Sequence, residues 1–226
     1  AAALFNLQEV GYIYSRLTNP TVSVLQERIA ALEGGVGGVG TSSGHAAQIM
    51  ALFALMRPGD NIVASTRLYG GTVTQFSHTI RRFGWSATFV DTDDLEAVEA
   101  AADDRTRAIF CESIANPGGY VSDIPALAKV AERLQVPLIV DTTSPTPWLC
   151  RPSEMGATLV VHSTTKYLSG NGTSVGGAII DSGRFDWTAA GTCPALTEPE
   201  PAYPGLQFQA TFGPRACTFH GIAIGL

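Results

Sequence analysis

The stretch Pro137-Leu-Ile-Val-Asp141 decides the fold. Its apolar residues follow one another without alternation, which is typical of a strand that helices cover on both faces of a sheet. Further short apolar runs occupy residues 61–65, 87–90, 108–112, 158–162 and 175–181. Helical patterns lie between most of them, at residues 20–33, 46–56, 72–83, 95–102 and 125–134. This alternation predicts an α/β chain, a three-layer α/β/α domain with a mostly parallel sheet.

The remaining segments depart from this pattern. Residues 36–43 are mostly small and lead into the apolar helix at 46–56. After Trp187 the residue composition changes. Residues 193–205 are rich in proline and acidic residues and are expected to form an irregular loop. The tail from Gln207 onward is too short to form a domain. We therefore expect a partial N-terminal segment at 1–20, a large domain at 21–187 and an irregular segment at 188–226.

The composition is that of a globular protein with a large core, because 45% of the 226 residues are hydrophobic and 15% are charged. The formal net charge is −6 and no basic run occurs, which argues against nucleic acid or an anionic membrane surface as a partner. The longest strongly apolar helical stretch, 46–56, is too short to cross a bilayer. We expect no signal peptide at the start of this sequence.

Cysteine and histidine usage bears on redox state and metals. The four cysteines form no C-x-x-C pair, so we expect reduced, buried thiols in a cytoplasmic protein. The four histidines are scattered and show no metal-ligand spacing, so no metal site is expected.

Three polar features follow or flank apolar strands, where parallel sheets bind ligands. Ser42-Ser43-Gly44 precedes an apolar helix, whose free N–H groups could hold a phosphate, or the three residues form a plain tight turn. Asp141 could bind a metal, a ribose or a protonated ring nitrogen, or cap a loop. In His162-Ser-Thr-Thr-Lys166, the lysine could form a Schiff base while the hydroxyls contact a phosphate, or it could lie at the surface.

Together these features meet the needs of pyridoxal 5'-phosphate (PLP). A lysine binds the aldehyde of this cofactor, and a strand-end aspartate keeps its pyridine nitrogen protonated. A helix start with nearby hydroxyls holds the phosphate. The glycines of residues 170–177 either allow the backbone a close approach or make the segment flexible.

Several motifs extend this interpretation along the chain. They are Tyr14-Ser-Arg16-Leu-Thr-Asn-Pro-Thr21, Ser42-Ser-Gly44, Leu68-Tyr69-Gly-Gly-Thr72, Glu112 to Pro117, Val140-Asp141-Thr, and Val161-His-Ser163-Thr-Thr165-Lys166-Tyr-Leu168. In this order they resemble the Cys/Met-metabolism family of PLP-dependent enzymes, which includes cystathionine γ-synthase, cystathionine and methionine lyases and the acylhomoserine sulfhydrylases. The resemblance implies the PLP-dependent transferase fold of type I, with a large domain like that of aspartate aminotransferase.

The resemblance also implies a role for each matching residue. Lys166 would carry PLP and move protons, Asp141 would pair with the pyridine nitrogen, and Tyr69 would stack on the ring and assist proton transfer. Asn116 would contact the phenolic oxygen of the ring. The phosphate would be bound by Ser43, Gly44, His45, Ser163 and Thr165, and by Tyr14 and Arg16 of a neighbouring subunit. The active sites would then be shared within a homo-oligomer, expected to be a dimer of dimers (a homotetramer).

The chain departs from the family pattern at three positions. His45 stands where methionine or glutamine is common, Thr142 replaces an asparagine, and Asn171 stands where the family often has histidine. These changes should leave PLP binding intact and bear on substrate preference. The family also has a segment before residue 1 and a C-terminal small domain, which supplies an arginine for the substrate carboxylate. Both are missing from this sequence, so residues 1–226 alone are expected to have little activity.

Within the family, the chain is most similar to the O-acetylhomoserine sulfhydrylases (O-acetylhomoserine aminocarboxypropyltransferases). The matching stretches include Ile29-Ala-Ala-Leu-Glu-Gly-Gly35, Gly183-Arg-Phe-Asp-Trp187 and Glu200-Pro-Ala-Tyr203. This resemblance implies γ-replacement on O-acetylhomoserine by sulfide or methanethiol, which gives homocysteine or methionine plus acetate. The alternatives are cystathionine γ-synthase, a methionine or cystathionine γ-lyase, O-succinylhomoserine sulfhydrylase, a PLP enzyme with another amino-acid substrate, and a PLP-binding chain without activity.

Overall fold

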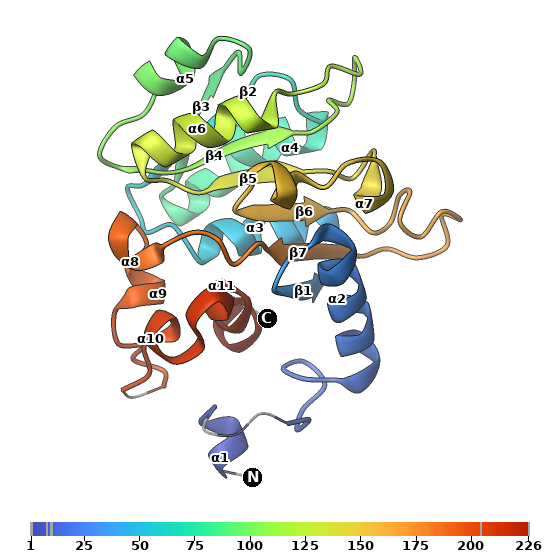
Figure 1. The fold of residues 1–226 in the computed structure, drawn as a ribbon, viewed down its shortest axis with the longest axis vertical. Coiled ribbons are helices and arrows are strands. Elements are labelled where there is room, and N and C mark those ends of the chain that lie inside the picture. The colour runs from blue at the N-terminus through green and yellow to red at the C-terminus, as the bar shows by residue number, and fades with distance from the viewer. Residues whose placement is uncertain (1, 8, 10, 204, 226) are drawn as a thin grey trace.

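A seven-stranded sheet forms the centre of the computed structural model, which describes residues 2–7, 9, 11–203 and 205–225. Within these residues the strand order is β1-β7-β6-β5-β4-β2-β3 (Figure 1). β7 runs antiparallel to β1 and β6, whereas the pairs from β6 to β3 are parallel, which confirms the mostly parallel sheet. The strands are β1 (Gly37–Thr41), β2 (Asn61–Ser65), β3 (Ser86–Val90), β4 (Thr106–Glu112), β5 (Leu138–Asp141), β6 (Leu159–His162) and β7 (Gly177–Asp181).

Helices cover both faces of this sheet and complete the three layers (Figure 1). Buried residues of α2, α5 and α6 pack on one face, and those of α3 and η1 pack on the other. None of the helices in the described ranges is long and apolar enough to span a membrane. The helices up to β6 are α1 (Ala2–Phe5), α2 (Pro20–Glu33), α3 (Gly44–Phe53), α4 (Gly70–Thr74), η1 (Gln75–Thr79), η2 (Ile80–Phe83), α5 (Leu95–Ala100), α6 (Ile124–Leu134), α7 (Thr146–Leu149) and η3 (Pro152–Met155).

The sheet divides the hydrophobic core in two, because successive side chains of a strand point to opposite faces. In β6, Leu159 and Val161 belong to the cluster that includes α3, whereas Val160 belongs to the cluster that includes α2 and α6. All three side chains are fully buried. The continuous apolar runs of the sequence therefore reflect helices on both sides of each strand.

The helix boundaries follow local start and stop signals. α2 begins at Pro20 behind Asn19, whose side chain accepts hydrogen bonds from the N–H groups of Thr21 and Val22. It ends at Glu33, and the capping residue Gly34 adopts the left-handed conformation with φ 73°. These signals are local, and the predicted boundaries of this helix agree with the observed ones.

The segment after β7 differs most from the prediction. It contains the short helices α8 (Trp187–Ala190), α9 (Pro194–Thr197), α10 (Phe208–Phe212), η4 (Gly213–Arg215), α11 (Ala216–His220) and η5 (Gly221–Gly225). Trp187, Leu196 and Phe208 are buried in the same cluster as α3. The stretch 193–205 therefore includes one helical turn, and apolar side chains hold it against the core. The division of the chain at residues 20 and 187 stays a prediction.

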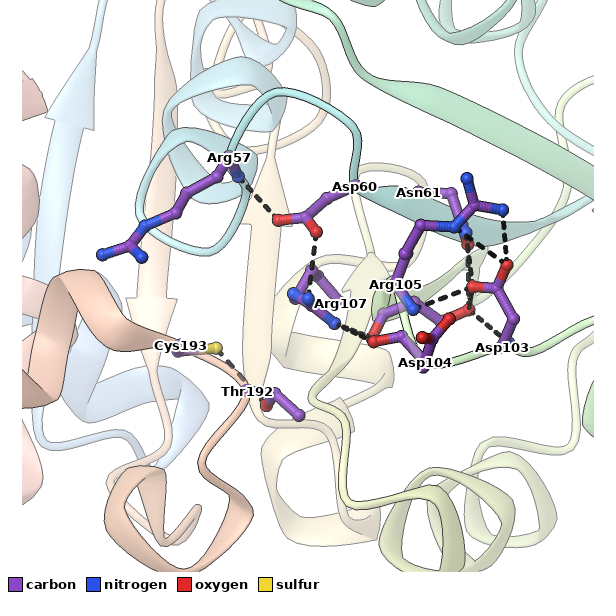
Figure 2. A network of polar contacts seen from close by, with 10 residues as sticks. Arg57, Asp60, Asn61, Asp103, Asp104, Arg105, Arg107, Thr192 and Cys193 are labelled. Atoms are coloured by element: carbon purple, nitrogen blue, oxygen red, sulfur yellow. Dashed lines mark hydrogen bonds and ion pairs between the residues drawn. The ribbon is translucent and has the colours of Figure 1, made fainter.

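Charged side chains connect the loops at the amino ends of β2 and β4 (Figure 2). Asp60 and Arg107 form an ion pair with a separation of 3.0 Å. Asp103 accepts a hydrogen bond from the side chain of Asn61 at 2.7 Å and pairs with Arg105 at 2.8 Å. These contacts fix the amino edge of the sheet and leave the loops at its carboxyl edge to form a site.

Candidate functional site

The loops at the carboxyl ends of β4, β5 and β6 enclose a cavity of about 590 Å³. The start of α3 and the loop before α4 complete its walls. Parallel α/β sheets bind ligands at this edge. The predicted site residues that line the cavity are Ser43, Gly44, His45, Tyr69, Asn116, Asp141, Ser163, Thr165 and Lys166. The structure therefore brings together the predicted residues other than Tyr14 and Arg16.

The first turn of α3 forms one wall of the cavity. Ser43 caps this helix, since its hydroxyl accepts the N–H of Ala46 at 3.1 Å and its carbonyl accepts the N–H of Ala47 at 3.0 Å. The N–H groups of Gly44 and His45 come earlier in the helix and have no acceptor within it. Together with the helix dipole they favour an anion at this end.

Gly44 allows α3 to approach the loop after β6. A Cβ atom at this position would lie 2.7 Å from the Cβ of Ser163, which is closer than side-chain atoms pack. Only glycine therefore fits without a shift of one of the two segments. This close contact joins the helix start and the loop that carries Lys166 into one wall.

Asp141 ends β5, and hydrogen bonds fix both oxygens of its carboxylate. Oδ1 accepts the N–H of Thr143 at 3.0 Å and its hydroxyl at 2.6 Å. Oδ2 accepts a hydrogen bond from Nε2 of Gln48 at 3.0 Å. With only 8% of the residue exposed and three donors around it, the carboxylate is held in one orientation.

Lys166 lies in the loop after β6, and its side chain is exposed. The loop is held to the one after β5, because the N–H of Ser163 donates to Oγ1 of Thr143 at 2.8 Å. The Thr165 hydroxyl donates to the carbonyl of Gly176 at 3.2 Å and accepts the N–H of the same residue at 3.0 Å. The predicted donation from Thr165 to a phosphate would therefore need a rotation of this hydroxyl, and it stays a prediction.

Tyr69 and His45 contribute two aromatic rings to the cavity wall. Their ring centroids are 5.9 Å apart, and the ring planes are inclined by 33°. Gly71 leaves room for both rings, since a Cβ there would lie 2.5 Å from Cε1 of Tyr69 and 2.6 Å from Cε1 of His45. Half of Tyr69 is exposed, so its ring is open to contact with a ligand in the cavity.

Glu112 ends β4 and lies beside Asp141 in the register of the two strands. Its Oε1 accepts the N–H of Tyr69 at 2.6 Å, and its Oε2 accepts the N–H of Asn116 at 2.9 Å. Burial raises the pKa of this carboxyl to about 7, although the two backbone hydrogen bonds act in the opposite direction. The side chain of Asn116 itself is exposed at the mouth of the cavity.

Tyr14 and Arg16 lie outside this cavity. The guanidinium carbon of Arg16 is 5.6 Å from the centre of the Tyr14 ring, which is largely exposed. Arg16 lines a second cavity of about 950 Å³, which His45 also borders. The predicted contact of both residues with a neighbouring subunit concerns a second chain, so it stays a prediction.

Three residues that hold the site together were not predicted from the sequence, namely Gln48, Glu112 and Thr143. Gln48 is a polar residue within an otherwise apolar helix, and this anomaly was the available signal. Glu112 ends its strand and Thr143 follows the next one, at the same edge as Asp141. The rule that identified Asp141 applies equally to them.

Comparison with known proteins identifies the family. The family model described as Cys/Met metabolism PLP-dependent enzyme matches residues 1–200. The chain belongs to this family. The expected resemblance and fold are thereby confirmed, and so is the dependence of the family on PLP.

Individual members of the family are closely similar. The chain is 50% identical over 215 residues to Sulfhydrylase FUB7 of Fusarium oxysporum f. sp. lycopersici, which covers 94% of this chain and 50% of that protein. It is 48% identical over 213 residues to O-acetyl-L-homoserine sulfhydrylase of Leptospira meyeri. This match covers 94% of this chain and 48% of that protein. A solved structure named as O-acetylhomoserine (thiol)-lyase of Campylobacter jejuni, with N'-pyridoxyl-lysine-5'-monophosphate, matches with a TM-score of 0.92 and 42% identity over 98% of this chain and 54% of that one. The chain spans about half the length of the curated relatives that it matches.

The cavity of this family member fits PLP. A lysine amine, a fixed carboxylate and a helix start with free N–H groups all border it. A side chain at position 44 would fill the space beside Ser163, and Gly44 leaves this space open. The volume of about 590 Å³ also suits a small cofactor with part of a substrate, since such sites measure roughly 300–1,000 Å³.

Proposed function

We propose that the protein replaces the acetate of O-acetylhomoserine with sulfide or methanethiol and so forms homocysteine or methionine. One observation carries this proposal. A lysine, a fixed aspartate and an open helix N-terminus border one cavity, in a chain that is 48% identical to an O-acetyl-L-homoserine sulfhydrylase. The family supports the use of PLP, and the sequence identity to sulfhydrylases supports the substrates.

Residues of the cavity would face the cofactor from the strand ends, from the loops that follow them and from the loop before α4. PLP, when bound, supplies an aldehyde that binds amines and an aromatic ring that withdraws electrons from the neighbouring substrate carbon. The amine of Lys166 would bind this aldehyde. The carboxylate of Asp141 would pair with the pyridine nitrogen, and the side chain of Asn116 would contact the phenolic oxygen. The half-exposed ring of Tyr69 would pack against the cofactor ring.

The phosphate group is assigned to the start of α3. The N–H groups of Gly44 and His45 would donate to it, and Ser43 holds the helix end in shape by capping it. The hydroxyl of Ser163 would add a donor from the loop after β6, and so would that of Thr165 once it rotates away from the carbonyl of Gly176. This end of the cavity attracts an anion through local dipoles, although the chain as a whole carries a net charge of −6.

Lys166 also moves protons in the proposed reaction. Its amine would take a proton from the α-carbon of the amino-acid substrate and pass this proton on, which makes the amine a base again. It would then take a proton from the β-carbon, after which the γ C–O bond breaks and acetate leaves. Sulfide or methanethiol then forms a C–S bond at the γ-carbon, and the two protons return to the carbon chain. One mobile amine can perform these steps because its side chain reaches the cavity from an exposed loop.

We further propose that the active sites are shared within a homo-oligomer. Tyr14 and Arg16 do not line the cavity of the same chain. They belong to the segment before α2, which lies below the body of the molecule in Figure 1. Arginine suits the phosphate of a neighbouring subunit because its guanidinium binds phosphate oxygens through two parallel hydrogen bonds.

The first test uses the protein expressed from its complete gene, loaded with PLP. We expect borohydride reduction to attach a pyridoxyl group to Lys166, detected by mass spectrometry of the digested protein. We also expect O-acetylhomoserine and sulfide to give acetate and homocysteine in equal amounts. The matched control is Lys129→Ala, because Lys129 is the other lysine of this chain and is exposed on α6.

The Lys166→Ala variant should lose the modification and the turnover, whereas Lys129→Ala should keep both. Pyridoxyl transfer to Lys129 instead of Lys166 would contradict the assignment of the lysine. If the protein forms cystathionine from cysteine but no homocysteine from sulfide, it is a cystathionine γ-synthase and not a sulfhydrylase.

A further inference from the structure

Two loops of the active-site cavity share one buried carboxylate. The loop before α4 carries Tyr69, and the loop after β4 carries Asn116. Glu112 accepts the backbone N–H of Tyr69 with one oxygen, at 2.6 Å, and that of Asn116 with the other, at 2.9 Å. Its position in the last pair of the β4–β5 ladder, opposite Asp141, anchors it to the rigid sheet.

We propose that Glu112 is a positioning residue, which fixes the loops of Tyr69 and Asn116 in the single arrangement that lets both side chains face the cofactor. The inference rests on the proposed function and deepens it. Glu112 touches no reacting atom in this account. Its action passes through the two backbone N–H groups that it accepts.

The geometry makes the carboxylate difficult to replace. Two N–H donors approach two different oxygens, and the ionised carboxyl, which predominates above its pKa of about 7, is the side-chain group that accepts at both ends. Glutamine has the same shape but carries an NH2 group at one end, so one backbone donor would face another donor. Aspartate keeps the charge but is one carbon shorter, so it can reach one loop and not both.

A second contact between the same loops lies at the surface. The guanidinium carbon of Arg67 is 4.4 Å from the centre of the Tyr120 ring, and Arg67 also pairs with Asp91 and Asp93. Tyr120 is 56% exposed, so this cation–π contact is weakened by water. Glu112 is only 6% exposed and accepts its bonds away from water, which makes it the stronger of the two connections.

The test compares Glu112→Gln and Glu112→Asp with the wild type, and uses Glu96→Gln as the matched control because Glu96 is exposed on α5. Amide hydrogen exchange in the PLP-free protein is followed by mass spectrometry on peptides that contain Tyr69 or Asn116. PLP affinity is measured by titration, and kcat and KM are measured with O-acetylhomoserine and sulfide.

We expect Glu112→Gln to speed exchange in at least one of the two loops and to weaken PLP binding at least tenfold. Exchange in β5 and β6 should stay unchanged. The kcat should fall more than the KM rises, because binding contacts of the substrate remain. Glu112→Asp should keep one loop protected, and Glu96→Gln should match the wild type in every measurement.

Three results would overturn the proposal. They are wild-type exchange and PLP affinity in Glu112→Gln, exchange that rises equally throughout the sheet, and failure of both Glu112 variants to fold. The last two would show that Glu112 maintains the fold as a whole. Hydrogen exchange and PLP affinity can be measured without turnover. If the protein is inactive with O-acetylhomoserine, the proposed function is rejected, but these two measurements still test the role of Glu112.

Discussion

At the scale of single residues, the site depends on side chains that orient other side chains. Gln48 donates to Oδ2 of Asp141 and to Oγ1 of Thr72, and it is almost fully buried. Thr143 donates to Oδ1 of Asp141 and accepts the N–H of Ser163. The orientation of one carboxylate is therefore set from α3, from its own loop and from the loop after β6.

Replacing Gln48 with leucine should weaken PLP binding without unfolding the protein. Leucine fills a similar volume but removes a donor from a buried carboxylate, which costs about 1–3 kcal/mol, or roughly 5- to 150-fold in affinity if it is felt only in the complex. Titration with PLP measures this change. Thr143→Val removes a donor and an acceptor and should have the larger effect. An unchanged PLP affinity in both variants would show that Asp141 needs no such support.

Sequence alone indicates Asp141 and Lys166 because both follow apolar strands, and strand ends are visible in a local pattern. It does not indicate that Gln48 contacts Asp141, because the two lie 93 positions apart. The same holds for Glu112 and Tyr69, 43 positions apart. Such pairs form only when α3 and α4 dock on the sheet, and no local periodicity records that docking.

At the scale of elements, the position of α3 relative to the loop after β6 decides whether the anion-binding end is formed. We expect Gly44→Ala to weaken PLP binding at least tenfold, since the new Cβ would lie 2.7 Å from the Cβ of Ser163 and 3.0 Å from its Cα. The start of the helix would move away from the hydroxyls opposite. PLP titration and the unfolding temperature of the PLP-free variant measure the two effects.

The control for this substitution is Gly70→Ala. Gly70 also begins a helix, but a Cβ there would meet no atom within 4 Å. Alanine has the higher helix propensity, so this variant should be as stable as the wild type and bind PLP as well. Equal PLP affinity in Gly44→Ala and Gly70→Ala would mean that the close contact with Ser163 is not required.

Elements differ in how well the sequence predicts them. β2 and β5 carry continuous apolar runs, and α2 has a proline start and a glycine stop, so these were predicted closely. β1 was less distinct because Gly37, Gly38 and Gly40 give no periodicity. A Cβ at Gly37 would lie 2.7 Å from Oγ1 of Thr218 on α11, and one at Gly38 would lie 3.0 Å from the carbonyl oxygen of Gln26 on α2. The close approach of these two helices therefore explains these two glycines of the strand. The helices after Trp187 likewise form through packing on the core, which a short irregular sequence does not reveal.

At the scale of the whole molecule, the helices after β7 are joined to the sheet through buried ionisable groups. Asp181 ends β7, accepts the N–H of Gly183 at 2.9 Å and accepts the Thr218 hydroxyl at 3.5 Å. Burial raises the pKa of Asp181 to about 6. Burial also lowers the pKa of His220, on α11, to about 4. Both groups therefore favour their neutral forms in the folded protein.

The two groups act on stability in opposite directions between about pH 4 and pH 6. The Asp181 carboxyl holds its proton in the folded state but not in the unfolded state, so its contribution is present below the unfolded pKa of 3.8 and is lost as the pH rises through about 6. His220 remains neutral in the folded state while the unfolded imidazole gains a proton. Its contribution is therefore lost as the pH falls from 6.5 towards about 4.

Asp181→Asn separates these effects. The amide oxygen can still accept from Gly183 and the NH2 group can donate to Thr218, while the buried charge is removed. We expect the stability of the variant relative to the wild type to rise by on the order of 2 kcal/mol between about pH 4 and pH 7. Urea unfolding of the PLP-free proteins at several pH values measures this difference. His220 and Glu112 titrate in both proteins, so their contributions cancel in it. A difference that is constant with pH would mean that water or a rearranged α11 solvates the Asp181 carboxylate in the folded protein.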